Sequence, residues 1–118
     1  MYIHSRGTAA DFVRAINGLK KIPSIDNAYI AKNARTFVTL DSVDLSGPEI
    51  EYKWTLHYIN PETAYTSKGY KLITIFGRKY ALHRLIAETY IPRPANTMQV
   101  IHKDGDKTNN KASNLDWR

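Results

Sequence analysis

Cysteine is absent from the 118 residues of this chain. That absence excludes a disulfide framework, a thiolate zinc site and a cysteine nucleophile. The chain also lacks any apolar run near the roughly 18 residues that a membrane-spanning helix needs, and no apolar segment follows its start as in a secretory signal. At this length we expect one compact unit that is intracellular and cytoplasmic, with no membrane partner.

Acidic residues are scarce in one stretch, because none occurs from Thr63 to Ala87. The whole chain has 17 Lys and Arg against 11 Asp and Glu, which gives a formal net charge of +6. Such an excess favours polyanionic partners, nucleic acid first, although a solvated charged face is the alternative. The cationic residues of the stretch are therefore candidates for DNA contacts: Lys68, Lys71, Arg78, Lys79 and Arg84.

The N-terminal third predicts a short helix over residues 8–17. Thr8 is a suitable N-cap, and Asp11 stands at the capping-box distance from it. Gly18 suits the position just past the end of the helix. Apolar residues recur at helical spacing and predict a face that docks on the core: Phe12, Val13, Ile16 and Leu19.

The remaining elements alternate between strands, turns and one further helix. β-branched and aromatic residues predict strands, Gly and Pro predict turns, and helical periodicity predicts the helix. Strands are expected at 29–30, 36–40, 52–59, 70–76, 80–82 and 98–101, turns at 24–27, 60–63 and 77–79, an acidic loop at 41–51, a helix at 83–90 and a rigid connector at 92–96.

The last seventeen residues, HKDGDKTNNKASNLDWR, concentrate the side chains with chemical capability. His102 can accept a proton near neutral pH. Asp104 and Asp106 offer oxygen ligands to a hard cation, although a turn with local hydrogen bonds is the alternative. Lys103 and Lys107 can meet phosphates. We expect Trp117 in the core, with base stacking as the alternative.

The three other histidines are expected to be structural. His83 should lie on the predicted second helix as a structural residue, and His4 and His57 should be surface or strand residues. None of the three has a neighbour in sequence that suggests a catalytic group.

The order of these motifs resembles the HNH homing-type endonucleases of phages and mobile introns. The resemblance covers about residues 68–118 and rests on the LHRLIA helix, the IPRP connector, His102-Lys-Asp-Gly, Asn109-Asn110 and Asn114-Leu-Asp-Trp. It implies an α+β fold with an N-terminal helix, a small antiparallel sheet and a C-terminal ββα-metal core. Residues 1–67 would form a DNA- or partner-associating region, and residues 68–118 the nuclease core.

The resemblance also implies a chemistry. His102 would be the general base that deprotonates the attacking water, and Asn114 would fix the loop and orient that histidine. A divalent cation, Mg²⁺ or Mn²⁺, would bind the scissile phosphate of a DNA substrate. The setting implied is a phage protein inside a bacterial host.

Two departures from the family pattern bear on activity. The residue before the histidine, usually Asp or Asn in the family, is Ile101, and the sequence stops before the family's last helix. Both expected protein ligands of the metal are therefore missing, and Asp104 and Asp106 are the nearest substitutes. A homodimer or a partner could instead complete the site. The alternative function is an inactive module that binds a host or phage protein.

Overall fold

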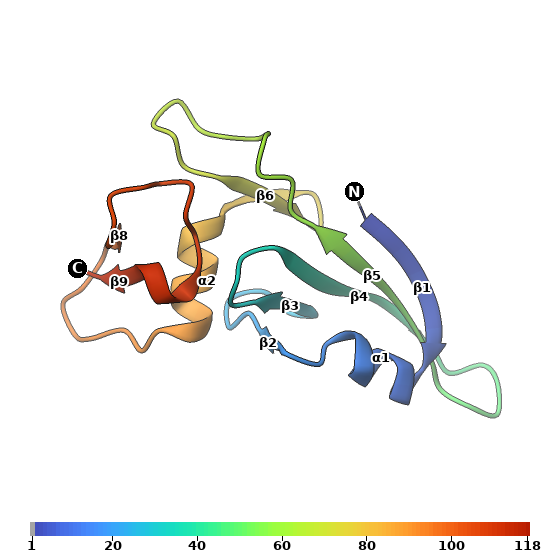
Figure 1. Cartoon of the computed structure of the whole chain (residues 1–118). Helices are drawn as coiled ribbons and strands as arrows, with labels where there is room; N and C mark the ends of the chain where they lie inside the picture. The colour runs from blue at the N-terminus through green and yellow to red at the C-terminus, as the bar shows by residue number, and fades with distance from the viewer. Residues whose placement is uncertain (1) are drawn as a thin grey trace.

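The computed structural model describes residues 2–118, with side chains from residue 5 onward. The described chain is an α+β fold of antiparallel strands and two α-helices, as the sequence predicts (Figure 1). Its elements are β1 (Tyr2–Thr8), α1 (Ala9–Ala15), β2 (Leu19–Lys21), β3 (Ala28–Ala31), β4 (Thr36–Asp44), β5 (Glu51–Tyr58), β6 (Leu72–Ile75), β7 (Arg78–Ala81), α2 (Leu82–Tyr90), β8 (Val100–His102), the 3₁₀ turn η1 (Ala112–Asn114) and β9 (Leu115–Trp117). Within residues 2–118, no helix is long and apolar enough to span a bilayer.

Five strands form the main sheet in the order β1-β5-β4-β3-β2, with every pair antiparallel. The sequence analysis predicted neither of the two edge strands, β1 and β2. β2 has only three residues, and Lys20 and Lys21 on it are exposed. Short, charged edge strands lack the apolar alternation by which strands are recognised, because only one side of an edge is paired.

The acidic stretch 41–51 is not wholly a loop, contrary to the sequence expectation. Residues Asp41 to Asp44 continue β4, and the register against β5 shifts between Leu40 and Ser42. The Asp41 carboxylate accepts hydrogen bonds from the hydroxyls of Thr39 (3.0 Å) and Thr55 (2.6 Å). A bulge accommodates the extra residue, and these two bonds explain why an acidic residue is stable inside a strand.

Helix α1 has the predicted capping box. The Asp11 amide donates to the Thr8 hydroxyl (3.4 Å), and the Thr8 amide donates to the Asp11 carboxylate (2.9 Å). Phe12 is buried and its ring stacks on Tyr52 with the centroids 5.5 Å apart. Val13 is 61% exposed, so the predicted docking stripe was wrong at that position. A helix of seven residues presents only about two turns, and one aromatic side chain covers its contact with the sheet.

The β6–β7 hairpin turns at Phe76-Gly77, and both residues have positive φ, 48° and 78°. Two consecutive positive φ values define a type I′ turn, whose twist matches paired strands. The turn predicted at 77–79 therefore begins one residue too late and ends two residues too late. Arg78 and Lys79 belong to β7 and are exposed on it.

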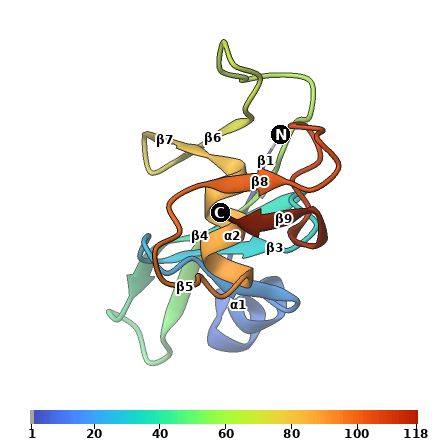
Figure 2. The ribbon, with the colours of Figure 1, turned by 90° about the vertical axis from the view of Figure 1, so that its left-hand side faces the viewer.

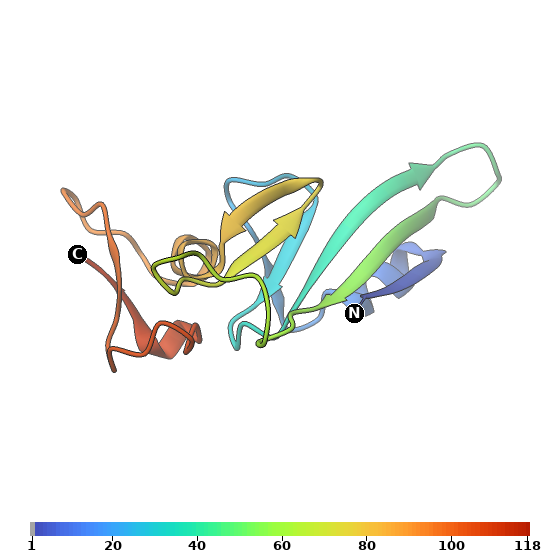
Figure 3. The same ribbon diagram turned by 90° about the horizontal axis from the view of Figure 1, so that it is seen from above.

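Helix α2 lies between the five-stranded sheet and the C-terminal strand pair β8–β9 (Figures 1 and 3). One cluster of buried apolar side chains joins all three, with Ile30 from the sheet, Ile86 from α2 and Leu115 from β9 among its members. Figure 2 shows β8 and β9 crossing in front of α2. The β8–β9 pair is thereby positioned by tertiary packing on α2 rather than by its own short ladder.

Trp117 is in this core, as predicted from the sequence. It is 8% exposed, and its indole Nε1 donates to the Ile91 carbonyl (3.0 Å). The strand before His102 begins at Val100, not at Met98, which is 73% exposed. Gln99 and Arg118 exchange both backbone hydrogen bonds (3.0 and 2.7 Å), so their pairing extends the β8–β9 contact by one residue, and the Met98 amide also donates to the Arg118 carbonyl (3.0 Å).

Candidate active site

His102 is the last residue of β8, opposite Leu115 of β9. The loop between the two strands, residues 103–111, closes through the Lys103 amide, which donates to the Asn114 carbonyl (2.7 Å). Gly105 adopts φ 76° and its amide donates to the His102 carbonyl (3.0 Å), a tight turn for which glycine is suited. The sequence pattern His-x-x-Gly thus turns the chain immediately after the histidine.

The His102 ring is held by Asn110. Its Nε2 lies 2.8 Å from the Asn110 Oδ1, and Asn110 is 5% exposed. With Oδ1 as the acceptor, Nε2 carries the proton, and Nδ1 keeps the lone pair that can accept a proton from water. Asn110 entered the sequence analysis as part of the Asn109-Asn110 motif, and its contact with the histidine ring was not predicted.

Asn114 holds the loop. Its side-chain Nδ2 donates to the Asp104 Oδ1 and to the Asn109 carbonyl, both at 2.9 Å, and its Oδ1 accepts from the Asp104 amide (3.2 Å). The expected loop-fixing contacts are therefore present. The contact to the histidine ring comes from Asn110 instead, because Asn114 is turned into the loop.

Removing the Asn114 amide should destabilise this loop measurably. In Asn114→Ala the Asp104 amide and the Asn109 carbonyl lose their hydrogen-bond partner, the buried Asn114 side chain. We therefore expect the free energy of unfolding to be about 2 kcal/mol lower than in wild type. Urea titration of the variant against wild type measures this. Asn17→Ala, at an exposed asparagine beyond α1, is the matched control and should change stability by less than about 0.5 kcal/mol.

Asp104 and Asp106 are used by the loop itself. The Asp104 carboxylate accepts hydrogen bonds from the backbone amide of Asp106 (2.8 Å) and from the side-chain amides of Asn109 and Asn114 (2.9 Å each). The Asp106 carboxylate accepts from the backbone amide (2.9 Å) and the hydroxyl (2.6 Å) of Thr108. The hydrogen bond from Asn109 holds the pKa of Asp104 below its usual value, and that from Thr108 does the same for Asp106. Both are thus ionised at neutral pH.

These carboxylates do not by themselves fit a metal ion. A divalent cation prefers several oxygen ligands that converge, whereas both oxygens of Asp104 already accept hydrogen bonds. Among residues 2–118 no cluster of three or more His, Asp or Glu side chains could hold one. Ile101 lies on β8 opposite Asp116 and supplies no ligand atom.

Two further aromatic rings border the histidine. The Tyr70 ring stacks on His83 with centroids 4.7 Å apart, and the His102 ring lies 5.3 Å from His83 and 6.2 Å from Tyr70. His83 is 7% exposed, and burial lowers its pKa to about 4. Its Nδ1 is buried with no hydrogen-bond partner among the described residues. A neutral His83 therefore forms an uncharged wall beside His102 at pH 7.

The predicted DNA-contacting cations differ in exposure, since all except Lys71 are exposed. The Lys107 ammonium donates to the Lys68 carbonyl (2.8 Å) and lies 4.7 Å from the centroid of the Tyr70 ring, which neighbours His83 and His102. Most of the others are exposed: Lys68, Arg78, Lys79, Arg84 and Lys103. Lys71 differs from the expectation, because it is 4% exposed and its ammonium donates to the Thr63 carbonyl. Burial lowers the pKa of Lys71, so its role in this structure is local.

Three comparisons with known proteins agree on one family. Residues 80–118 match the sequence description of the family "HNH endonuclease". The HNH endonuclease L245 of Acanthamoeba polyphaga mimivirus is 42% identical over 53 residues, which cover 42% of this chain and 16% of that protein. A solved structure of the HNH homing endonuclease I-HmuI, described for DNA binding and cleavage, covers 85% of this chain and 51% of its own, with a TM-score of 0.54 and 21% identity.

The structural similarity shows a shared fold, and the family match falls on the segment that carries His102 and its loop. The chain spans 16% of the length of the curated relative and about half of the length of the solved one. Through residues 80–118, about a third of its length, this chain is similar to the HNH endonuclease family.

Proposed function

We propose that the protein is a metal-dependent DNA endonuclease in which His102 is the general base. The observation that carries the proposal is the fixed His102 ring, held by Asn110 in a loop that Asn114 holds. A base must be oriented toward its water before it is useful, because proton transfer requires hydrogen-bond geometry. The match of the same segment to the HNH endonuclease family supports the reaction class.

His102 Nδ1 would take a proton from a water molecule while the water oxygen attacks the phosphorus of a DNA phosphodiester. The bond from phosphorus to one bridging sugar oxygen would break, and that oxygen would leave with the bonding electron pair and take up a proton from solvent. The neutral state of His83 supports this role, because a charged imidazolium 5.3 Å away would disfavour protonation of His102. Asn114 would act as a positioning residue that holds the loop, and Asn110 would hold the ring itself.

A divalent cation, Mg²⁺ or Mn²⁺, is part of the proposal, since general-base assistance contributes only about 10²–10⁴ to the rate. Hydrolysis of phosphate esters needs accelerations many orders of magnitude larger. The described residues do not form a cage for such an ion. The proposal therefore requires that a second copy, a partner or ligands outside residues 2–118 complete the site.

DNA is the proposed substrate, contacted by the exposed cations Lys68, Arg78, Lys79, Arg84, Lys103 and Lys107. If the protein binds through phosphates, the logarithm of its affinity should fall linearly with the logarithm of salt concentration. The slope should be near −0.9 for each phosphate neutralised, or about −5 if all six engage. Fluorescence anisotropy with duplex DNA between 25 and about 200 mM salt measures this slope; a slope near zero would contradict phosphate contacts.

The nuclease proposal is tested by incubating the protein with supercoiled plasmid and Mg²⁺ or Mn²⁺. Conversion to the nicked form, abolished by EDTA, is the expected result. Background nicking in both metals at every protein concentration would remove the enzyme proposal for this chain alone and for its self-assembled form.

A second candidate function is supported by Ile101, which stands where the family usually has a metal ligand and offers no ligand atom. In this alternative the protein has lost cleavage and binds a host or phage protein. DNA affinity at low salt separates the two candidates. A protein that neither nicks plasmid nor binds DNA at low salt would favour the protein-binding role.

A further inference from the structure

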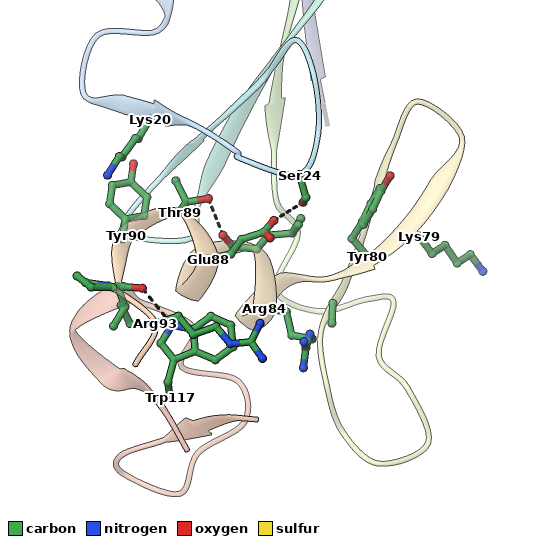
Figure 4. A pocket seen from close by; sticks show the side chains of 14 residues that line it. Lys20, Ser24, Lys79, Tyr80, Arg84, Glu88, Thr89, Tyr90, Arg93 and Trp117 are labelled. Carbon is green, nitrogen blue, oxygen red and sulfur yellow. Dashed lines mark hydrogen bonds between the residues drawn. The ribbon is translucent and has the colours of Figure 1, made fainter. Parts of the chain in front are cut away.

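A cavity of about 680 Å³ lies outside the His102 loop, against the flank of α2 that carries Arg84 and Glu88 (Figure 4). These two residues are four apart and so share one helix face. β2 borders the cavity through Lys20, β7 through Lys79, and the connector after α2 through Arg93. Neither His102 nor any residue of the 103–111 loop lines it.

Four cationic side chains surround this groove, and none of them forms an ion pair within residues 2–118. They are Lys20, Lys79, Arg84 and Arg93. Among the residues that line the groove the acidic one is Glu88, and its carboxylate accepts a hydrogen bond from the Ser24 hydroxyl (2.5 Å). Four positive charges against one negative charge leave a strongly cationic concave surface.

The guanidinium groups of Arg84 and Arg93 are held in place without a carboxylate that would neutralise their charge. Arg93 Nε donates to the Thr97 carbonyl (2.8 Å), and the guanidinium carbon lies 4.9 Å from the Trp117 ring (Figure 4). Arg84 Nη1 donates to the Met98 carbonyl (3.3 Å). A carbonyl or an aromatic face orients a guanidinium but leaves its full charge, whereas a carboxylate would cancel it.

Lys20 completes the other end of the groove. Its ammonium lies 5.9 Å from the centroid of the Tyr90 ring, whose hydroxyl donates to the Ile30 carbonyl. The hydrogen bond therefore fixes the Tyr90 side chain of α2 against the main sheet, and the Lys20 ammonium lies over this fixed ring. Oriented cations along a concave surface, with aromatic rings behind them, match a chain of phosphates better than a single small anion.

We infer that this groove, defined by Lys20, Lys79, Arg84 and Arg93, binds the phosphodiester backbone of DNA as a second contact surface beside the His102 loop. The inference deepens the proposed function and rests on it for the identity of the ligand. Lys79 and Arg84 were candidates from the sequence, whereas Lys20 and Arg93 enter only because the fold brings β2 and the connector alongside α2.

The test compares the salt dependence of DNA binding for wild type, Lys20→Gln, Arg93→Gln and the double variant, by anisotropy with duplex DNA in EDTA so that no cleavage occurs. Each single variant should reduce the slope of log affinity against log salt by about 0.9, and the double variant by about 1.8. Arg14→Gln is the matched control, because Arg14 is 78% exposed on α1 and outside the groove, and its slope should equal that of wild type.

Because Arg93 also packs on Trp117, the thermal midpoint of each variant is measured, and Lys20→Gln carries the conclusion if Arg93→Gln is unstable. Wild-type slopes in both Lys20→Gln and the double variant would overturn the inference, as would wild type that binds no DNA.

If inorganic phosphate at matched ionic strength protects wild type from unfolding but not the double variant, while DNA slopes are equal, the groove binds small phosphates and the DNA assignment is wrong. Plasmid nicking is scored separately, so loss of cleavage with intact slope differences would overturn only the enzyme proposal.

Discussion

Substitution of His102 by alanine is expected to lower metal-dependent plasmid nicking by about 10²–10⁴-fold while DNA binding remains within about twofold. The magnitude is that of a lost general base. DNA affinity should persist because the exposed cations, not the imidazole, would contact phosphates. Initial nicking rates in Mg²⁺ and Mn²⁺, with protein in excess over plasmid, measure the loss.

The matched control for this variant is Met98→Ala, a side chain that is 73% exposed just before β8. It should nick at the wild-type rate. His102→Ala should also retain the wild-type circular dichroism spectrum, since its ring makes one side-chain hydrogen bond, to Asn110. Equal nicking by wild type and His102→Ala would sink the assignment of His102 as the base, and would attribute any activity to a contaminant or another group.

Acidification from pH 7 to pH 4 should lower the free energy of unfolding by roughly 3 kcal/mol through His83. Burial lowers the pKa of this histidine from 6.5 to about 4 in the folded chain. The unfolded chain therefore takes up the proton first as pH falls, and stability present above pH 6.5 is lost as pH falls toward 4. Each pKa unit is about 1.4 kcal/mol, which gives the magnitude. Urea titrations at half-unit pH intervals measure the slope.

His83→Phe should flatten the curve between pH 6.5 and 4. Phenylalanine keeps a ring against Tyr70 and leaves no buried nitrogen without a partner. The charged or titratable groups near His83 are His102 and Arg84, which lower its pKa less than burial does. His102→Ala should accordingly keep most of the slope and serves as the control.

Aspartates contribute in a lower pH window and can be told apart from His83. Hydrogen bonds lower the pKa of Asp11, Asp44, Asp104 and Asp106 below 3.8, so they bind protons only in stronger acid. An unchanged slope in His83→Phe between pH 6.5 and 4 would show that His83 is solvated in solution.

Local patterns in the sequence were sufficient for much of the fold. Thr8 and Asp11 specified the start of α1 because a capping box involves residues only three apart. The LHRLIA stretch specified α2 through its apolar spacing. The edge strand β1 was missed because its partner β5 lies more than forty residues away, and β2 was missed because three residues with two exposed lysines carry no strand pattern.

The candidate site divides in the same way. The sequence by itself determined the HNH segment, the turn after His102 and the loop around Asn114, since those contacts lie within about a dozen residues. The contact of Asn110 with the His102 ring is equally local, but the spacing did not tell which asparagine of the loop faces the ring. Only the tertiary structure decided that Lys71 is buried and that Lys20 and Arg93 face one groove. The physical reason is that burial and charge pairing depend on which distant elements pack together, here α2 against both the sheet and β8–β9, and no local spacing contains that information.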